Sequence, residues 1–329
     1  MKKEDLRIVF MGTPEFAVES LKRLVEGGYN VVAVVTQPDK PVGRHQDTLQ
    51  PSQVKQYALS QGLPVLQPVK MKDPEFIAQL QSYNADLQVV VAFRMLPEVV
   101  WDMPRFGTFN VHAALLPQYR GAAPINWAVI NGETQTGVTT FFLDHDIDTG
   151  RIIMQKPFAV PDDADVEYVY DGLMHLGAEI ATETIDKLLE GDGDVASLPQ
   201  SEFIGDDTVL HNAPKIFKET CRIDVAQPAK KVYDFIRGLS PYPGSWLEMQ
   251  KEGGKVQVLK IFKSRKTGTS IVGEGILPGT FKVEGKSLLL ACADQWLEIL
   301  SLQMSGKKRM ESRDFLNGVR DIELFKIKG

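Results

Sequence analysis

Short apolar runs alternate with helix-forming stretches through the first half of this chain, and this alternation constrains the fold more than any other feature. Residues 6–11, 31–36, 87–92 and 109–112 have the composition of buried strands. The run Val89-Val90-Val91 is continuously apolar, which is typical of parallel strands that helices cover on both faces. Strands that alternate with helices form mostly parallel sheets through right-handed crossovers. The first half is therefore predicted to be an α/β domain with a mostly parallel sheet.

Proline marks the expected starts of helices in this region, and a pair of apolar runs extends the predicted sheet. Residues 138–142 and 152–158 predict a hairpin-type extension, joined by the polar segment 144–150. Proline is expected at the first position of three helices, at Pro14, Pro74 and Pro124, and the first two follow a predicted N-cap residue, Thr13 and Asp73.

The second half of the chain changes character after one long predicted helix. Apolar residues recur near the helical period through residues 166–189. A helix is expected at residues 230–238, and short strands between glycine turns are expected at residues 255–262, 275–277 and 287–291, which indicates a small β-barrel. The predicted division is a first domain at 1–200, a polar linker at 201–214 and a second domain at 215–329.

Length and composition place the chain in a broad class. Its 329 residues are enough for two domains with their own cores, and its only cysteines are Cys221 and Cys292. We interpret these as reduced thiols of a cytoplasmic protein, because they lack the spacing of a zinc site. No run approaches the roughly 20 apolar residues that a membrane span needs, and we expect no signal peptide.

The net charge of −6 conceals an asymmetry between the last third of the chain and the rest. Residues 222–329 carry 19 Lys and Arg against 12 Asp and Glu, so an acidic first part is joined to a basic last part. A basic surface on an otherwise acidic protein can face a polyanion such as nucleic acid. A solvated surface without a partner explains the same charges, so charge alone does not decide between the two.

The strongest chemical constellation lies between residues 110 and 150. Asn110 and His112 are separated by one residue on a predicted strand, so their side chains share one face. They fall near the carboxyl end of a parallel strand, where α/β sheets bind ligands. An acyl transfer to an amine needs donors for an oxyanion and a route for a proton. Asn110 and His112 can donate, and Asp148 can orient the imidazole and help move the proton.

Each of these residues also has a purely structural interpretation. A histidine on a strand is more often structural than catalytic, and an Asp-x-Gly sequence is most often a turn. The set lacks the geometry of a metal site, so no metal is expected. Gly12-Thr13-Pro14 follows a strand and opens a helix, but it lacks the further glycines of a dinucleotide site.

Motifs along nearly the whole chain give these residues a context. The sequence has Phe-Met-Gly-Thr-Pro-Glu-Phe-Ala at 10–17, Asn-Val-His at 110–112, Arg-Gly-Ala-Ala-Pro at 120–124, Asp-Thr-Gly at 148–150 and Ser-Pro-Tyr-Pro-Gly-Ser-Trp at 240–246. In this order they closely resemble the methionyl-tRNA formyltransferases, which are folate-dependent formyltransferases. The resemblance implies a Rossmann-like first domain followed by a smaller OB-like β-barrel domain.

The resemblance also implies a reaction and a set of site residues. The formyl group of 10-formyltetrahydrofolate is expected to pass to the α-amino group of methionyl-initiator tRNA, giving N-formylmethionyl-tRNA for translation initiation. Asn110, His112 and Asp148 would be catalytic. The residues expected to line the folate site are Ala114, Leu115, Leu116, Pro117, Phe93, Arg94, Met95, Leu96, Asp144 and Asp146.

We expect the tRNA to lie across the basic second domain and the loop that contains Lys40 and Arg44, with contacts from Lys307, Lys308 and Arg309. The chain departs from the family pattern at three places. His-Gln-Asp stands at 45–47 instead of a basic stretch, Arg94 stands where glycine is commoner, and Ala114 replaces a serine. A monomer without membrane contact is expected.

Two alternatives remain open at this point. A formyltransferase with the same core could act on a sugar nucleotide or on glycinamide ribonucleotide, although the basic second domain argues against it. A non-enzymatic RNA- or folate-binding module could also use the barrel, and would bind without transferring a formyl group.

Overall fold

The computed structural model describes residues 1–42, 48–319 and 321–328. The described chain forms two compact units whose segments alternate in sequence. Unit 1 comprises Met1–Gly121, Gln135–Ala159 and Tyr170–Asn212, and unit 2 comprises Ala122–Thr134, Val160–Val169 and Ala213–Gly329.

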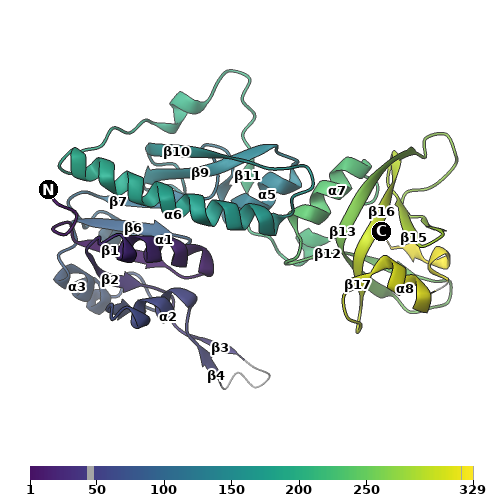
Figure 1. Cartoon of the computed structure of the whole chain (residues 1–329), viewed down its shortest axis with the longest axis horizontal. Coiled ribbons are helices and arrows are strands. Elements are labelled where there is room, and N and C mark those ends of the chain that lie inside the picture. The colour runs from purple at the N-terminus through teal and green to yellow at the C-terminus, as the bar shows by residue number, and fades with distance from the viewer. Residues whose placement is uncertain (43–47, 320, 329) are drawn as a thin grey trace. The chain divides into compact units, whose positions relative to one another are not determined.

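Unit 1 is built on a seven-stranded sheet in the order β10-β9-β7-β6-β1-β2-β5 (Figure 1). The five strands from β7 to β5 run parallel, while β9 is antiparallel to β7 and β10 is antiparallel to β9. The mostly parallel, Rossmann-like sheet predicted from the sequence is therefore confirmed. Its strands are β1 (Ile8–Gly12), β2 (Val31–Val35), β5 (Val65–Leu66), β6 (Leu87–Val91), β7 (Thr108–His112), β9 (Gln135–Phe142) and β10 (Ile152–Ala159).

Helices and short ribbons connect these strands. The predicted helix at 166–189 is confirmed as α6, which packs against β7 and α1: a Cβ atom added at Gly177 would lie 3.4 Å from Val111 and 3.8 Å from Phe16. The elements are α1 (Glu15–Glu26), β3 (Lys40–Val42), β4 (Thr48–Gln50), α2 (Gln53–Ser60), α3 (Pro74–Ser82), α4 (Glu98–Trp101), β8 (Arg120–Gly121), α6 (Val166–Glu190), the 3-10 helix η1 (Gln200–Phe203) and β11 (Asn212–Ala213).

Two of the three proline-marked helix starts are confirmed and one is wrong in detail. The Asp73 carboxylate accepts a hydrogen bond from the Glu75 N–H at 3.0 Å, and α3 begins at Pro74. Thr13 does not cap α1, because Pro14 takes the capping position and the helix begins at Glu15. The Thr13 hydroxyl instead accepts a hydrogen bond from the Gln37 N–H at 3.4 Å, at the end of the neighbouring strand.

Unit 2 contains an antiparallel sheet in the order β14-β15-β16-β13-β12-β18, with β17 paired to β16. This curled sheet confirms the small OB-like barrel. Its buried face encloses a core that includes Leu247, Leu259 and Leu297. The elements are α5 (Pro124–Ile130), η2 (Glu219–Cys221), α7 (Ala229–Gly238), β12 (Ser245–Gln250), β13 (Gln257–Ser270), β14 (Phe281–Glu284), β15 (Ser287–Ala291), β16 (Gln295–Met304), β17 (Met310–Glu311), α8 (Ser312–Gly318), η3 (Ile322–Leu324) and β18 (Lys326–Ile327).

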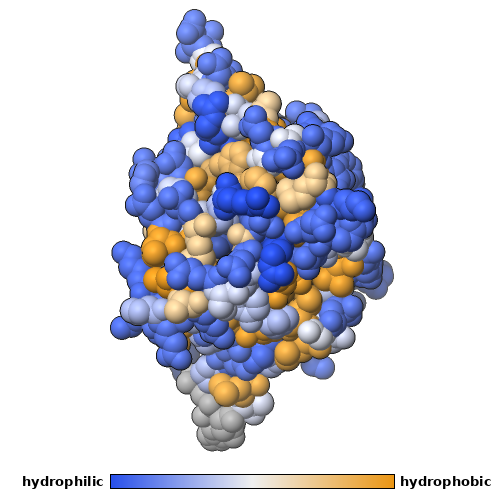
Figure 2. Space-filling model, turned by 90° about the vertical axis from the view of Figure 1, so that its left-hand side faces the viewer, coloured by the Kyte–Doolittle hydropathy of each residue, from blue (hydrophilic) through white to orange (hydrophobic). Residues whose placement is uncertain are grey.

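One predicted strand of the barrel is wrong. Residues 275–277 form no strand: a turn covers residues 272–275, where Gly273 and Gly275 have φ values of +84° and +72°, in the left-handed region that a strand does not use. Within the described residues, no helix is long and apolar enough to cross a membrane. Polar side chains cover most of the face shown in Figure 2, with apolar side chains in small groups between them.

Candidate active site

Strand β7 presents Asn110 and His112 on one face of the unit 1 sheet. The intervening Val111 faces α6, so the side chains on either side of it point to the opposite face. On the antiparallel neighbour β9, Phe141 lies opposite Asn110 and Thr139 lies opposite His112. His112 is the last residue of β7, at the carboxyl end that the sequence indicated.

The imidazole of His112 is buried, with 6% of its side chain exposed, and is held by a backbone carbonyl. Its Nε2 donates a hydrogen bond to the carbonyl oxygen of Tyr119 at 2.8 Å. A carbonyl oxygen only accepts, so this contact keeps a proton on Nε2 and leaves Nδ1 as the nitrogen that gains or loses one. The edge of the ring packs against Phe141, with the ring centres 6.4 Å apart.

Asp148 approaches the same imidazole from the loop between β9 and β10. Its Oδ2 lies 3.9 Å from His112 Nδ1, which is an ion-pair distance when the ring is charged and is too long for a direct hydrogen bond. The same oxygen accepts a hydrogen bond from the Gly121 N–H at 2.9 Å. The structure therefore brings the amide, the imidazole and the carboxylate of the predicted set into one region of unit 1.

Asn110 differs from its two neighbours because its carboxamide is not fully satisfied. Its Oδ1 is buried and has no hydrogen-bond partner. A buried polar atom without a partner costs about 1–3 kcal/mol, so a native structure rarely keeps one without a reason. Because this oxygen is closed to solvent, a ligand would meet the Nδ2 end of the Asn110 carboxamide.

A buried threonine holds the segment 114–117, which was predicted to contact folate. The Thr139 hydroxyl donates to the carbonyl of Ala114 at 2.7 Å and accepts from the Leu116 N–H at 3.1 Å. Gln155 donates to the same hydroxyl at 3.0 Å and to the Leu116 carbonyl at 2.7 Å. Leu115 is partly exposed, whereas Ala114, Leu116 and Pro117 are buried.

The segment from Phe93 to Leu96 follows β6, the parallel neighbour of β7, and so lies at the same edge of the sheet as His112. Met95 is exposed and Leu96 is buried. The guanidinium of Arg94 donates to the carbonyl of Val69 at 2.9 Å and to that of Pro68, and its burial lowers the pKa of Arg94. The Arg94 side chain therefore ties this segment to the 68–69 loop.

Asp144 and Asp146 are exposed on the loop that also carries Asp148. The Asp144 carboxylate accepts a hydrogen bond from the N–H of His145 at 2.7 Å. The neighbouring Leu143 packs against two clusters, one containing Leu96 and the other containing Leu116. That shared contact brings the start of the loop next to both of the other predicted folate segments.

The residues predicted to bind tRNA lie in separate units. In unit 1, Lys40 is exposed on the β3–β4 ribbon, while Arg44 lies outside the described residues. In unit 2, Lys307 and Lys308 are exposed on the turn before β17. Arg309 follows them; its Nε donates to the Ser301 hydroxyl at 2.9 Å, and its guanidinium lies 4.4 Å from the centre of the Phe262 ring.

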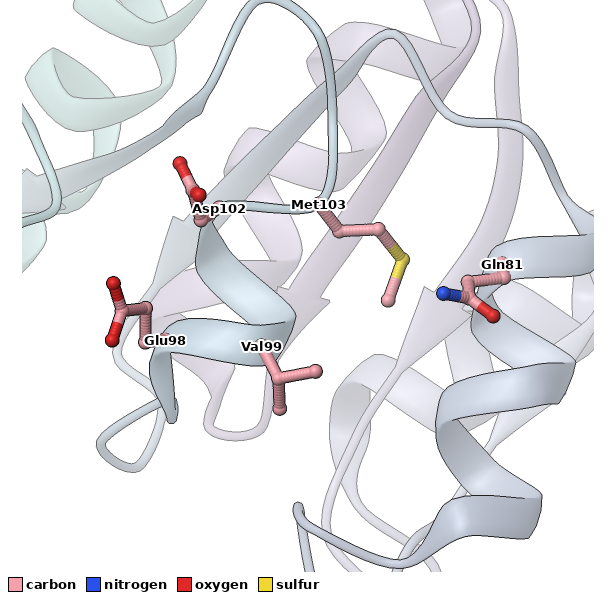
Figure 3. A pocket seen from close by; sticks show the side chains of 5 residues that line it. All are labelled: Gln81, Glu98, Val99, Asp102 and Met103. Atoms are coloured by element: carbon pink, nitrogen blue, oxygen red, sulfur yellow. The ribbon is translucent and has the colours of Figure 1, made fainter.

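Two cavities in unit 1 are lined by none of the predicted site residues. The first, of about 470 Å³, is lined by Gln81, Glu98, Val99, Asp102 and Met103. Figure 3 shows Val99 and Met103 directed toward Gln81 across the space between α3 and α4, with both carboxylates on the other side of α4. The second, of about 670 Å³, lies beside β10 and the segment that follows α6. Within the described residues, no group of three His, Cys, Asp or Glu side chains could hold a metal ion.

Several residues of this region were missed from the sequence. The carbonyl of Tyr119 and the side chain of Gln155 contact the candidate site, but neither stands in a pattern that points to it. Gln200 is a third example: its side chain donates to the carbonyls of Asp148 and Gly150 at 2.8 and 3.0 Å. Thr139, which holds the segment 114–117, was missed as well.

Comparison with known proteins defines first the class of protein. A family model described as formyl transferase matches residues 6–185, and a model for the formyl transferase C-terminal domain matches residues 215–320. Among solved structures, HypX from Aquifex aeolicus in complex with tetrahydrofolic acid is 18% identical, with a TM-score of 0.59 over 94% of this chain. This chain spans about half of HypX, covering 47% of it. WlaRD, a sugar 3N-formyl transferase, is also 18% identical, with a TM-score of 0.62 over 92% of this chain and 99% of its own.

Relatives at higher identity define the family more narrowly. The methionyl-tRNA formyltransferase of Parabacteroides distasonis is 60% identical over 99% of this chain and 100% of its own length. That of Porphyromonas gingivalis is 46% identical over 97% of both chains. The chain belongs to the methionyl-tRNA formyltransferase family.

Proposed function

We propose that the chain transfers the formyl group of 10-formyltetrahydrofolate to the α-amino group of methionyl-initiator tRNA. The observation that carries this proposal is the meeting of Asn110, His112 and Asp148 at the end of β7, in a chain 60% identical to a methionyl-tRNA formyltransferase over its full length. The product, N-formylmethionyl-tRNA, would serve translation initiation.

The proposed reaction begins with attack of the neutral amine on the formyl carbon. The carbon–nitrogen bond that forms gives a tetrahedral intermediate with a negative oxygen. Because Oδ1 of Asn110 is turned into the protein, Nδ2 is the end of its amide that we expect to donate to this oxygen. No serine or cysteine nucleophile is needed, since the amine attacks directly.

His112 and Asp148 have complementary parts in this scheme. With Nε2 committed to the Tyr119 carbonyl and Nδ1 facing Asp148, His112 is placed to stabilise the oxyanion through its positive charge. Asp148 keeps the imidazole charged and relays the proton that the amine loses toward the folate nitrogen. The bond between that nitrogen and the formyl carbon then breaks, and tetrahydrofolate leaves with the proton.

The substrate sites follow from the surrounding segments. We propose that folate lies against Ala114–Pro117 and the two loops that meet at Leu143, namely 93–96 and 144–146. The tRNA would contact Lys40, Arg44 and the basic turn at 307–309. In this scheme residues 1–200 carry the chemistry, 215–329 bind tRNA and 201–214 link them. We further propose a monomer that works in the cytoplasm.

A single-turnover assay tests the catalytic set. Purified protein is mixed with 10-formyltetrahydrofolate and methionyl-tRNA, and formyl-methionyl-tRNA is measured by mass. His112→Ala and Asp148→Asn are each expected to lower the rate by about 10²–10³. Activity within about fivefold of the parent in both variants would overturn the roles given to these residues. A parallel reaction with an amino-sugar nucleotide as acceptor separates the proposed substrate from that of WlaRD.

A further inference from the structure

We infer that Gln200 is a positioning residue that holds Asp148 in its working orientation, an inference that rests on the catalytic role proposed for Asp148. The side chain of Gln200 is buried, with 4% of the residue exposed. Its Nε2 donates to the carbonyl of Asp148 at 2.8 Å and to that of Gly150 at 3.0 Å. One amide nitrogen therefore ties down both ends of the turn that presents the carboxylate.

The other end of the same amide is held by Arg120. Oε1 of Gln200 accepts from Nε of Arg120 at 3.0 Å and from Nη2 at 2.6 Å, so two nitrogens of the guanidinium donate to one oxygen. Arg120 is followed directly by Gly121, whose N–H donates to the Asp148 carboxylate at 2.9 Å. The contacts form a closed circuit through Arg120, Gln200, the Asp148 backbone, the Asp148 side chain and Gly121.

The backbone of Asp148 explains why such a circuit is needed. Its φ of +56° lies in the left-handed region, which is uncommon for residues other than glycine. Conformations of this kind persist when surrounding contacts determine them. The Asp148 carboxylate stands 3.9 Å from His112 Nδ1, so relaxation of the turn would change the geometry that the proposed proton relay uses.

The direction of the Gln200 amide is fixed by its partners. Two carbonyl oxygens can only accept, and a guanidinium can only donate, so the reversed amide would face like groups at both ends. Gln200→Glu distinguishes the bond to Arg120 from the bonds to the carbonyls of Asp148 and Gly150. The glutamate keeps an acceptor for Arg120 and adds charge to that pair, but it places an oxygen against the carbonyls of Asp148 and Gly150.

The test compares Gln200→Leu and Gln200→Glu with a matched control in unit 2. Asn126 also donates a side-chain amide hydrogen to a distant backbone carbonyl, that of Gly238 at 2.9 Å, so Asn126→Leu removes a comparable bond without touching Asp148. Single-turnover rates of both Gln200 variants should fall by about 10–10²-fold with KM for either substrate unchanged. Asn126→Leu should keep the parent rate at a similar loss of melting temperature.

The pH profile and a double-mutant cycle complete the experiment. In Gln200→Leu the shape of the pH–rate profile should change, whereas a general loss of folded protein would scale the whole profile. Adding Gln200→Leu to Asp148→Asn should lower the rate no further than Asp148→Asn alone, because asparagine tolerates the left-handed backbone but lacks the carboxylate.

Four outcomes overturn the inference. A Gln200→Glu rate equal to the parent would show that Gln200 serves only as a partner of Arg120. Additive losses in the double variant would show that it acts elsewhere. If Gln200→Leu keeps the parent rate while Asp148→Asn is impaired, the inference is refuted and the proposed function stands. If Asp148→Asn is fully active, the role proposed for Asp148 is refuted, and this inference is refuted with it.

Discussion

Replacing Thr139 with valine removes one oxygen that three groups of the candidate site share. The hydroxyl is fully buried, donates to the carbonyl of Ala114 and accepts from the Leu116 N–H and the Gln155 amide. Valine has nearly the same shape, so the change leaves little empty space. Its effect is therefore dominated by the hydrogen bonds that disappear.

The magnitude follows from the groups that would be left without a partner. The Gln155 amide keeps its bond of 2.7 Å to the Leu116 carbonyl, whereas the Leu116 N–H and the Ala114 carbonyl no longer have Thr139 to bond with. Each buried backbone group left unsatisfied costs about 1–3 kcal/mol, so Thr139→Val should destabilise unit 1 by about 2–6 kcal/mol. This is a large part of the roughly 5–15 kcal/mol that stabilises a typical domain.

The strand β9 offers a matched control. Thr136 is also buried, with 3% exposed, but its hydroxyl has no hydrogen-bond partner. Thr136→Val should therefore be neutral or stabilising, because it removes a polar atom whose burial is uncompensated. Urea unfolding gives the free-energy difference, and hydrogen exchange at the Leu116 amide reports the local effect.

Function should follow the same contrast. Because segment 114–117 is proposed to contact folate, Thr139→Val should raise KM for the folate donor, while Thr136→Val should leave it unchanged. Equal losses of stability in the two variants, or a Leu116 amide protected as in the parent, would refute the reasoning that this hydroxyl organises the segment.

Three further predictions concern other parts of the chain. Gly150→Ala should destabilise unit 1 by about 1–3 kcal/mol and impair formyl transfer, because the new Cβ would lie 1.7 Å from the Phe142 carbonyl oxygen. Gly318→Ala is the control, since its new Cβ would have nothing within 4 Å. Equal melting temperatures of the two variants would contradict the prediction. The basic turn consists of Lys307, Lys308 and Arg309. Neutralising all three should make the slope of log affinity for tRNA against log salt less steep by roughly 0.7–0.9 for each phosphate that they neutralise. An unchanged slope would show that these side chains lie outside the tRNA interface. Burial raises the pKa of Cys292 to about 12, so a thiol reagent at pH 8 should label it only as fast as the protein unfolds, and rapid labelling of native protein would disagree.

The sheet of unit 1 could be predicted from the sequence because its buried parallel strands are largely apolar, as in the run from Val89 to Val91 in β6. The barrel was harder to predict. β13 extends to Ser270 through a largely polar stretch, and its pairing with β16 shifts register at several points, so no simple alternation marks it. Glycine turns were also mistaken for a strand at 275–277, because composition alone does not reveal a positive φ.

The candidate site was predictable in the part that depends on strand geometry. A period of two places Asn110 and His112 on one face wherever the strand lies. The approach of Asp148 depends on a left-handed residue in a loop, and from the residues alone it was only one possibility; the family resemblance supplied it. Gln200 could not be found in this way, because its contacts with Asp148 and Gly150 join residues about fifty positions apart, and it stands at the end of the expected first domain without a motif around it.

Residues 186–214 lie between the two matched family models and are hydrogen-bonded at several points to the loops around His112. Leu198 exchanges two backbone hydrogen bonds with Ile152, and the carbonyl of His211 accepts from the Tyr119 N–H at 2.7 Å. Gln118 donates to the carbonyl of Val209 at 2.7 Å. When relatives exchange C-terminal parts, a crossover after residue 212 should therefore keep these bonds, at the cost of the contacts that residues 122–134 and 160–169 make within unit 2. A crossover near residue 185 would instead combine these loops with a segment 186–212 from a different relative.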